Sequence, residues 1–185
     1  MLKAKNLSDY MINIRQVESD PVHEIVYQYP QQGGMVATGN FHLFQASGLG
    51  VTSGLRGLLV ASDMQGREAE FNRFDGQRRL LGEVVAEEVE IISQLGILPP
   101  PESIGVLLAG DLYVAEDLGK RGGKGDVCDV WRAFRDRFRW VVGIPGNHDR
   151  FGANIAPPDE FLAEPGIHYL DRGVVELDGI RIGGV

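Results

Sequence analysis

The chain has 185 residues, of which 43% are hydrophobic and 24% charged, a composition typical of a globular domain rather than a disordered segment. Its formal net charge of -8 at pH 7 disfavours unaided binding to nucleic acid or to an anionic membrane, because phosphate contacts need clustered Lys and Arg. The single cysteine, Cys128, excludes an intrachain disulfide, and the polar N-terminus lacks a signal-peptide core, so we expect a cytoplasmic protein with no membrane partner.

The N-terminal part of the chain is expected to form a β-hairpin. Residues 1–20 are polar and show no clear periodicity. The segments "HEIVYQY" (23–29) and "MVATGNFHLF" (35–44) alternate or run apolar, and "QQGG" lies between them. We therefore predict an N-terminal extension, residues 1–50, that contains a hairpin and leads into a loop at 48–57.

The rest of the chain alternates strand and helix patterns. Continuous apolar runs predict buried strands at 57–62, 104–110 and 139–144, and amphipathic patterns predict helices between them at 77–96 and 126–138. The first helix is expected to carry a buried apolar stripe and a solvated acidic row, namely Leu81, Val85, Val89, Ile92 and Leu95, and Glu83, Glu87 and Glu90. This order of elements predicts an α/β domain.

The second helix and the C-terminal segment complete the pattern. Asp126 is expected to be the N-cap of the helix at 126–138, whose aromatic stripe faces the core. A short helix is predicted at 157–164. A hairpin is predicted at 174–185, turning on Asp178-Gly179, because Asp-Gly between apolar runs strongly favours a tight β-turn.

Polar residues follow each of the three predicted strands. Asp63, Asp111 and Asn147 stand at the ends of the apolar runs. In parallel sheets, the loops past the carboxyl ends of the strands meet in one crevice. We therefore expect these side chains to converge there, together with Gln65 and His148.

The converging groups are suited to divalent metal ions. Unpaired buried carboxylates repel one another and lose hydration, and a cation relieves both costs. Asp and Asn oxygens and His nitrogens suit Mn²⁺, Fe, Zn²⁺ or Mg²⁺. In a two-metal site, ions ~3.5–4 Å apart activate a hydroxide for in-line attack on phosphorus. His148 would then protonate a leaving oxygen, and Asp149 would orient its ring.

Three motifs in this order resemble those of the calcineurin-like metallophosphoesterases. They are "SDMQG" (62–66), "AGDLY" (109–113) and "PGNHD" (145–149), which resemble the family patterns D-x-H, G-D and G-N-H-[DE]. The resemblance covers residues 57–185 and leaves out residues 1–50. It implies a metallophosphoesterase-like β-sandwich flanked by helices (αββα), of which residues 51–185 would be a partial domain.

The resemblance also implies a role for each matched residue. Asp63 would bind the first metal ion, Asp111 would bridge both ions, and Asn147 would bind the second. His148 would be the catalytic acid and Asp149 its partner. The implied activity is hydrolysis of a phosphomonoester or phosphodiester with two divalent metal ions.

Two departures from the family pattern leave an alternative open. Gln65 stands where the family has a His ligand, and it is either a metal ligand or a solvated loop residue. The family's downstream His motifs do not occur before Val185, and His168, in "GIHYL", lacks their context. We therefore expect a chain that lacks the C-terminal part of the domain and is inactive alone. The alternative is a degenerate, non-catalytic scaffold that binds a protein partner.

Structural interpretations remain open for several polar residues. Asp63 and Asp111 could be caps, and Asn147 and Asp149 could be Asx-turn residues. Arg67 and Arg150 could meet a substrate phosphate or pair with local carboxylates. The stretch "GKRGGKGD" (119–126) lacks the phosphate-loop spacing and is expected to be a flexible loop. His23 and His42 are expected to be structural or surface residues, and His168 is expected to be a hairpin or surface residue.

Overall fold

The computed structural model describes residues 12–49, 54–69 and 78–184. The strands are β1 (Asn13–Val17), β2 (His23–Pro30), β3 (Val36–Leu43), β4 (Ala46–Leu49), β5 (Gly57–Ala61), β6 (Arg67–Glu68), β7 (Ile104–Ala109), β8 (Gly125–Asp126), β9 (Trp140–Ile144), β10 (Asp149–Arg150), β11 (Ile167–Tyr169), β12 (Val174–Leu177) and β13 (Ile180–Gly183). The helices are α1 (Leu81–Gln94), α2 (Cys128–Arg137), α3 (Asp159–Leu162) and the 3₁₀ turn η2 (Pro101–Ser103). None of the helices in these ranges is long and apolar enough to cross a lipid bilayer.

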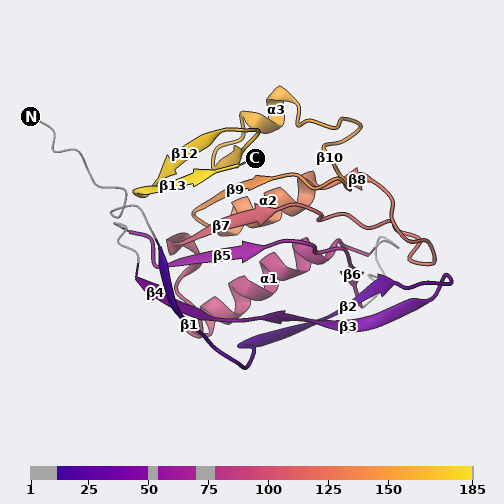
Figure 1. Ribbon diagram of the computed structural model, residues 1–185, viewed down its shortest axis with the longest axis horizontal. Helices are drawn as coiled ribbons and strands as arrows, with labels where there is room; N and C mark the ends of the chain where they lie inside the picture. Colours follow the sequence, from indigo (N-terminus) through magenta and orange to yellow (C-terminus); the bar gives the residue numbers. More distant parts are fainter. Residues whose placement is uncertain (1–11, 50–53, 70–77, 185) are drawn as a thin grey trace, which may run out of the picture.

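The centre of the molecule is a parallel four-stranded sheet in the order β11-β9-β7-β5 (Figure 1). Its inner strands are apolar on both faces, as the continuous runs predicted, and the α/β class is confirmed. The close pairing of β7 with β9 depends on Gly105. A Cβ atom there would lie 2.2 Å from the ring of Trp140, its partner in the register.

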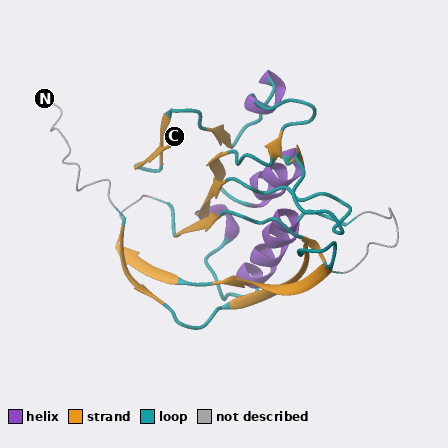
Figure 2. Ribbon diagram, turned by 45° about the vertical axis from the view of Figure 1, so that its right-hand side comes forward, coloured by secondary structure: helices purple, strands orange, loops and turns teal. Residues whose placement is uncertain are grey.

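The two faces of the sheet are covered by different kinds of structure. Helices α1 and α2 pack on one face, where Trp131 and Phe134 are fully buried. The hairpin β12–β13 packs on the other face, over Trp140, Val142 and Leu170 (Figure 2). Leu177 pairs with Ile180, so the two residues of the turn are Asp178 and Gly179, as predicted.

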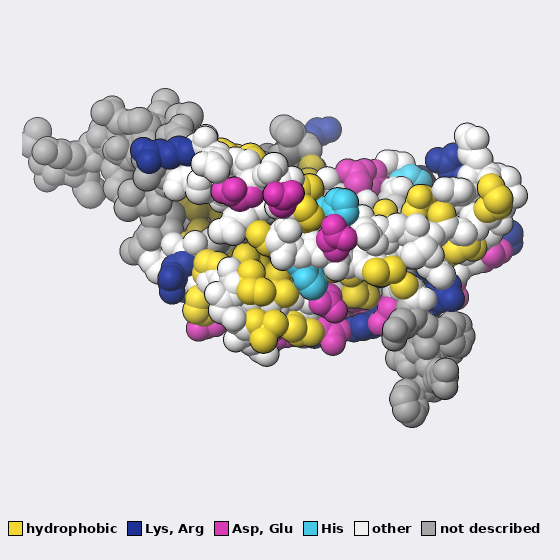
Figure 3. All heavy atoms as spheres, turned by 90° about the horizontal axis from the view of Figure 1, so that it is seen from below, with side chains coloured by type: hydrophobic (Ala, Val, Ile, Leu, Met, Phe, Trp, Pro, Cys, Tyr) yellow, Lys and Arg dark blue, Asp and Glu magenta, His cyan; other side chains and the backbone are white. Residues whose placement is uncertain are grey.

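The N-terminal hairpin is part of the same body. Strands β2 and β3 pair along their full length, and β6 adds a third strand to β2. Ile25, on the inner face of the hairpin, is 4% exposed and belongs to the core formed with α1. The outer face, seen from below in Figure 3, mixes His and acidic side chains with hydrophobic ones. The sequence pattern predicted this hairpin correctly, but not its contact with the domain.

Helix α1 differs from the predicted pattern at both its apolar stripe and its acidic row. Leu95 is 70% exposed, because the helix ends at Gln94 and Gly96, at φ +79°, reverses the chain. The glutamates are engaged rather than freely solvated. Glu83 accepts a hydrogen bond from the Leu80 backbone N–H, and Glu87 and Glu90 form ion pairs with Arg79 and Arg137.

Other elements depart from the prediction by smaller amounts. Asp126 lies one residue before the N-cap of α2, yet its carboxylate accepts a 2.9 Å hydrogen bond from the Cys128 N–H. Strands β1 and β4 pair with each other, although residues 1–20 showed no clear pattern and residues 48–57 were expected to form a loop. The other part of that predicted loop, residues 50–53, lies outside the described residues. His168 lies in β11, a fourth parallel strand that was not predicted.

Candidate active site

Three loops meet at the carboxyl edge of the sheet. They follow β5, β7 and β9, which are neighbours in the sheet order, so the loops that carry the predicted residues lie side by side. The Asp63 N–H donates a 3.0 Å hydrogen bond to the Gly110 carbonyl. The His148 N–H donates a 3.2 Å hydrogen bond to Oδ1 of Asp111. Each loop is thus bonded directly to its neighbour.

Two glycines allow this close approach. A Cβ atom on Gly110 would lie 2.4 Å from the backbone nitrogen of Gly146. A Cβ atom on Gly146 would lie 2.1 Å from Oδ1 of Asp111. The glycines of the G-D and G-N-H-D motifs therefore serve one structural purpose, which is to let the second and third loops touch without an intervening side chain.

In each of the first two loops, the aspartate is followed by a buried residue that holds the loop in position. Met64 and Leu112 are fully buried and anchor their loops in the core. Asp63 and Asp111 precede these two residues. Their φ angles of 54° and 55° lie in the left-handed region, which residues other than glycine rarely adopt. Asp63 is exposed and Asp111 half-buried. Such backbone conformations persist where the surrounding structure holds them and are enriched at functional sites.

The ring of His148 is held by the Gly-rich loop, residues 119–126. Its Nδ1 lies 2.7 Å from the carbonyl oxygen of Gly123. A carbonyl can only accept a hydrogen bond, so Nδ1 carries the proton of this contact. The other nitrogen, Nε2, is then the atom that accepts or donates a proton toward the cavity. The Gly-rich loop was expected to be a flexible connection, and this contact with the site was not predicted.

Asp149 has a different role from the one expected. Its side chain is 1% exposed and accepts hydrogen bonds from the backbone N–H groups of Leu112 (2.8 Å), Tyr113 (3.2 Å) and Gly146 (2.8 Å). The carboxylate therefore ties the second loop to the third, whereas the His148 ring is oriented by the Gly123 carbonyl. The expectation that Asp149 orients the ring is wrong, because both carboxylate oxygens are directed to the backbone.

A cavity of about 670 Å³ opens beside these loops. Gln65 and His148 line it, together with Tyr113 and Val114 from the second loop. Asp63, Asp111 and Asn147 lie on the same loops but outside the lining. Gln65 is half-buried and lines the cavity, and both interpretations, as a metal ligand and as a solvated loop residue, stay predictions.

The donor atoms of the site suit hard divalent cations. Asp63, Asp111, Asn147 and Gln65 offer carboxylate and amide oxygens, which Mg²⁺ and Mn²⁺ prefer. In the parts of the chain that the structure describes, no three His, Cys, Asp or Glu residues form a metal-binding group. The described residues therefore offer two carboxylates supplemented by amides, a set that fits a cation only in part.

Known proteins offer no direct guide to this site. Comparisons of the chain with protein-family models, with curated proteins and with solved structures found no match. The chemistry of the site is therefore argued from its own residues.

The two arginines next to the motifs have structural contacts. Arg67 is 6% exposed, and its guanidinium donates hydrogen bonds to the carbonyls of Val114 (2.9 Å), Ala115 (3.2 Å) and Arg78 (2.5 Å). This arrangement fixes the loop that carries Tyr113 and Val114, and among the described residues the hydrogen-bond partners of Arg67 are backbone carbonyls rather than a carboxylate. Arg150 donates a hydrogen bond to the Asp149 carbonyl and is half-buried.

The remaining histidines lie in structural surroundings. His168 is half-buried in β11, and burial lowers its pKa. His23 forms a 2.9 Å contact with Glu88 of α1, and His42 lies 3.5 Å from Glu24. The expectation that His23 and His42 are structural or surface residues is confirmed. The expectation that His168 is a hairpin or surface residue is wrong, because it lies half-buried in the parallel strand β11.

Sequence reasoning missed half of the cavity wall. Tyr29, Gln31 and Met35 line the cavity from the N-terminal hairpin, and Arg121 lines it from the Gly-rich loop. No local pattern marks these residues as part of a site. The sequence feature related to their position is the glycine content of the hairpin tip and of the Gly-rich loop, which permits the backbones of these two segments to touch.

Proposed function

We propose that this chain carries part of a metal-dependent phosphoesterase site, with Asp63, Asp111 and Asn147 as metal ligands and His148 as the catalytic acid. The observation that carries the proposal is the direct bonding of the three loops, which links the loops of two left-handed aspartates to the loop of His148. A simple capping role would explain one aspartate, but not three linked loops with an oriented ring. The structure shows an α/β fold. That this fold is the αββα sandwich of the metallophosphoesterases is part of the proposal.

The chain's own residues divide the work of the reaction. Divalent cations would supply Lewis acidity toward the phosphate ester and its attacking water. Asp111 is placed centrally, because its loop lies between the other two. His148 holds a proton at Nε2 and transfers it to the leaving oxygen, while the Gly123 carbonyl keeps the ring oriented through Nδ1. Asp149 maintains the distance between the loops of Asp111 and His148.

A non-catalytic scaffold is the alternative, and Gln65 favours it. An amide oxygen is a neutral and weaker donor than the imidazole that the family pattern places there. The oriented His148 ring favours the enzyme, since a scaffold has no use for a positioned acid. Metal binding and hydrolysis separate the two.

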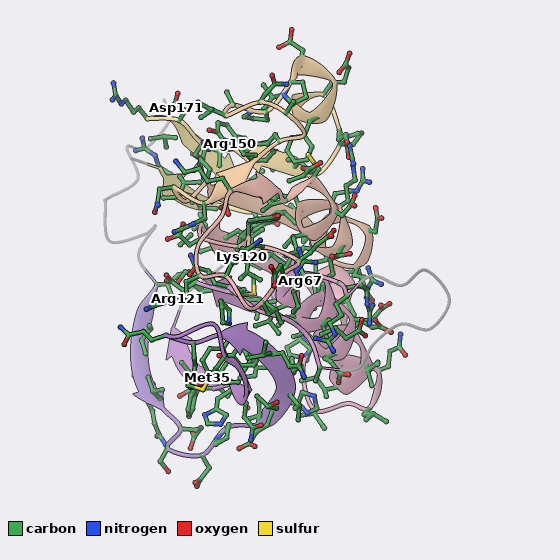
Figure 4. The ribbon with its side chains drawn as sticks, turned by 90° about the vertical axis from the view of Figure 1, so that its right-hand side faces the viewer. Met35, Arg67, Lys120, Arg121, Arg150 and Asp171 are labelled. Carbon is green, nitrogen blue, oxygen red and sulfur yellow. The ribbon has the colours of Figure 1, made fainter. Side chains whose placement is uncertain are left out.

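The first test measures Mn²⁺ binding to the 185-residue chain by isothermal titration calorimetry. We expect Asp111→Asn to weaken binding by more than the roughly 10- to 100-fold typical of residues one step removed from a metal. Asp171→Asn is the matched control, because Asp171 is an exposed aspartate that follows β11 at the same edge (Figure 4). Equal loss in both variants, or no binding by the unmodified chain, would contradict the proposal.

The second test measures hydrolysis of bis(4-nitrophenyl) phosphate and 4-nitrophenyl phosphate with Mn²⁺. We expect hydrolysis by the 185-residue chain to be slow, and we expect His148→Ala to remove it while leaving Mn²⁺ binding intact. Loss of Mn²⁺ binding in His148→Ala would make His148 a ligand instead of the acid. Gln65→His should tighten Zn²⁺ binding if Gln65 is a ligand, and unchanged affinity would remove it from the metal site.

A further inference from the structure

The cavity extends well beyond the residues that the reaction needs. Its volume of about 670 Å³ lies in the range of small-molecule sites, and is far larger than one phosphate requires. Tyr29 and Met35 line it from the N-terminal hairpin, and Arg121 lines it from the Gly-rich loop. Figure 4 shows Met35 on the hairpin, with Arg121 nearby and Lys120 and Arg67 further along the same end of the molecule. The hairpin therefore forms a wall of the site.

This wall is tied into the fold at two places. The hairpin tip, residues 31–35, is closed by a 2.7 Å hydrogen bond from the Gln31 N–H to the Met35 carbonyl. A Cβ atom on Gly34 would lie 3.2 Å from the carbonyl oxygen of Gly119, so the tip touches the Gly-rich loop. On the other side, β2 pairs with β6, whose Arg67 holds the loop of Tyr113 and Val114. The hairpin thus contacts the Gly-rich loop at its tip and is linked to the loop of Tyr113 through β6 and the Arg67 side chain.

The lining combines aromatic, amide and basic groups. Gln31, Gln32 and Gln65 each present an amide that can both donate and accept hydrogen bonds. Tyr29 offers a ring, and its hydroxyl lies 3.5 Å from the Gln31 amide nitrogen. Arg121 is the one lining residue with a permanent charge, and the described lining has no carboxylate. A cationic group would find no counter-charge here, whereas a planar group with donors and acceptors beside a phosphate would fit.

The position of His148 decides which part of a substrate lies in the cavity. His148 lines the cavity, and a catalytic acid must contact the leaving oxygen. The alcohol part of the ester therefore extends from His148 toward Tyr29 and the hairpin tip. A base can stack on Tyr29 and be read by the amides of Gln31 and Gln32.

We propose that the cavity binds the nucleoside of a nucleoside monophosphate, with Tyr29, Gln31 and Gln32 contacting the base and Arg121 the phosphate. This inference rests on the proposed function for the reaction, and on the cavity alone for binding. In the reaction, water forms a new P–O bond and the bond from phosphorus to O5′ breaks. His148 gives its Nε2 proton to O5′ and regains one from the attacking water, so the products are nucleoside and inorganic phosphate. The net charge of -8 favours a mononucleotide over a polynucleotide.

The test compares ligand binding to the full 185-residue chain without metal. Isothermal titration calorimetry is performed with adenosine 5′-monophosphate, ribose 5-phosphate and inorganic phosphate. We expect the nucleotide to bind about 10-fold or more tightly than ribose 5-phosphate, the range that one stacked base provides. Tyr29→Ala should remove that preference. Thr38→Ala, on the exposed outer face of the same hairpin, is the matched control and should keep it.

A second measurement uses the unmodified chain, in case Tyr29→Ala does not fold. Photolabelling with 8-azidoadenosine 5′-monophosphate should mark the tryptic peptide of residues 16–56, which contains the whole hairpin. Excess adenosine 5′-monophosphate should prevent the labelling, and excess ribose 5-phosphate should not. Equal affinity for nucleotide and sugar phosphate, or labelling outside the cavity walls, would overturn the proposal.

The outcomes distinguish this inference from the proposed function. Nucleotide preference in a chain that binds no Mn²⁺ and hydrolyses no aryl phosphate would overturn the phosphoesterase and leave the nucleoside cavity. Mn²⁺-dependent hydrolysis of aryl phosphates without nucleotide preference would overturn the nucleoside cavity and leave the phosphoesterase.

Discussion

Three aspartates share one unusual backbone conformation but have opposite surroundings. Asp63, Asp111 and Asp178 have φ angles of 54°, 55° and 49°. In the β12–β13 turn, the Asp178 carboxylate accepts hydrogen bonds from the Arg139 guanidinium (2.7 and 2.6 Å) and from the Trp140 indole (2.8 Å). At the carboxyl edge of the sheet, Asp63 has no side-chain partner among the described residues, and Asp111 uses only Oδ1.

The difference shows how a structural aspartate can be told from one available for ligands. The same strained conformation occurs in both regions, so strain alone does not mark a site. In the turn, the side chain is satisfied by protein donors and the strain is offset locally. At the sheet edge, the carboxylates keep free oxygens, which is what a cation needs. The following predictions compare the two kinds of aspartate, from the largest expected effect to the smallest.

The buried Asp149 is the extreme structural case. Asp149→Ala leaves three backbone N–H groups without an acceptor, so the free energy of unfolding should fall by about 3 kcal/mol or more. Urea denaturation followed by circular dichroism measures the change. The adjacent Asn147 is exposed, and Asn147→Ala should change stability by less than about 0.5 kcal/mol. Similar losses in the two variants would contradict the structural role of Asp149.

Asp178→Gly tests how much the hydrogen bonds of the Asp178 carboxylate stabilise the β12–β13 turn. Glycine accepts the positive φ at no steric cost, but the Trp140 indole N–H loses its acceptor, and Trp140 is only 5% exposed. We expect a net loss of about 1–2 kcal/mol in the free energy of unfolding. Thermal and urea denaturation should agree on the sign. A gain in stability would mean that the strain outweighs the hydrogen bonds.

The Asp178 carboxylate should also contribute to the pH dependence of the free energy of unfolding. Hydrogen bonding from Arg139 lowers the pKa of Asp178 below its ordinary value of 3.8. The stabilisation is therefore present above pH 4 and is lost as the pH falls through the lowered pKa of the folded state. Asp178→Asn should reduce the slope of unfolding free energy against pH in this acidic window. Parallel curves for the two proteins would refute the assignment.

Asp63→Gly should have the smallest effect on stability and the opposite sign. Its carboxylate stabilises no described neighbour, and glycine relieves the positive φ, so we expect the free energy of unfolding to rise by about 0.5 kcal/mol. Mn²⁺ affinity should fall in the same variant. A loss of stability would indicate that Asp63 is a structural residue like Asp178.

The elements that sequence patterns predicted are those with strong local signals. The continuous apolar runs of β7 and β9 need both faces buried, and only a covered sheet provides this. The run of β5 was predicted for the same reason, but β5 is an edge strand and leaves Val60 66% exposed. The Asp-Gly turn of β12–β13 has an equally local cause. Strand β11 has three residues and strand β1 is polar, so neither has enough periodicity to be recognised. Leu95 fits the helical period, but it follows the last helical residue and is exposed.

The site was predictable only where it depends on strand order. Asp63, Asp111 and His148 were expected together because consecutive parallel strands end at the same edge. The role of Asp149 follows from three backbone contacts that no spacing encodes. Tyr29 and Arg121 reach the cavity through the contact between the hairpin tip and the Gly-rich loop, and their separation in the sequence hides it.

That contact also sets an order for folding during synthesis. Gly34 meets Gly119, so the hairpin leaves the ribosome about 85 residues before its partner loop, which is roughly 4 to 17 seconds at ordinary elongation rates. An isolated two-stranded hairpin is marginally stable in water. It gains its third strand when β6 emerges, and the cavity closes only after the Gly-rich loop has followed. The first wall of the site to be made is therefore fixed in place only when a wall made later reaches it.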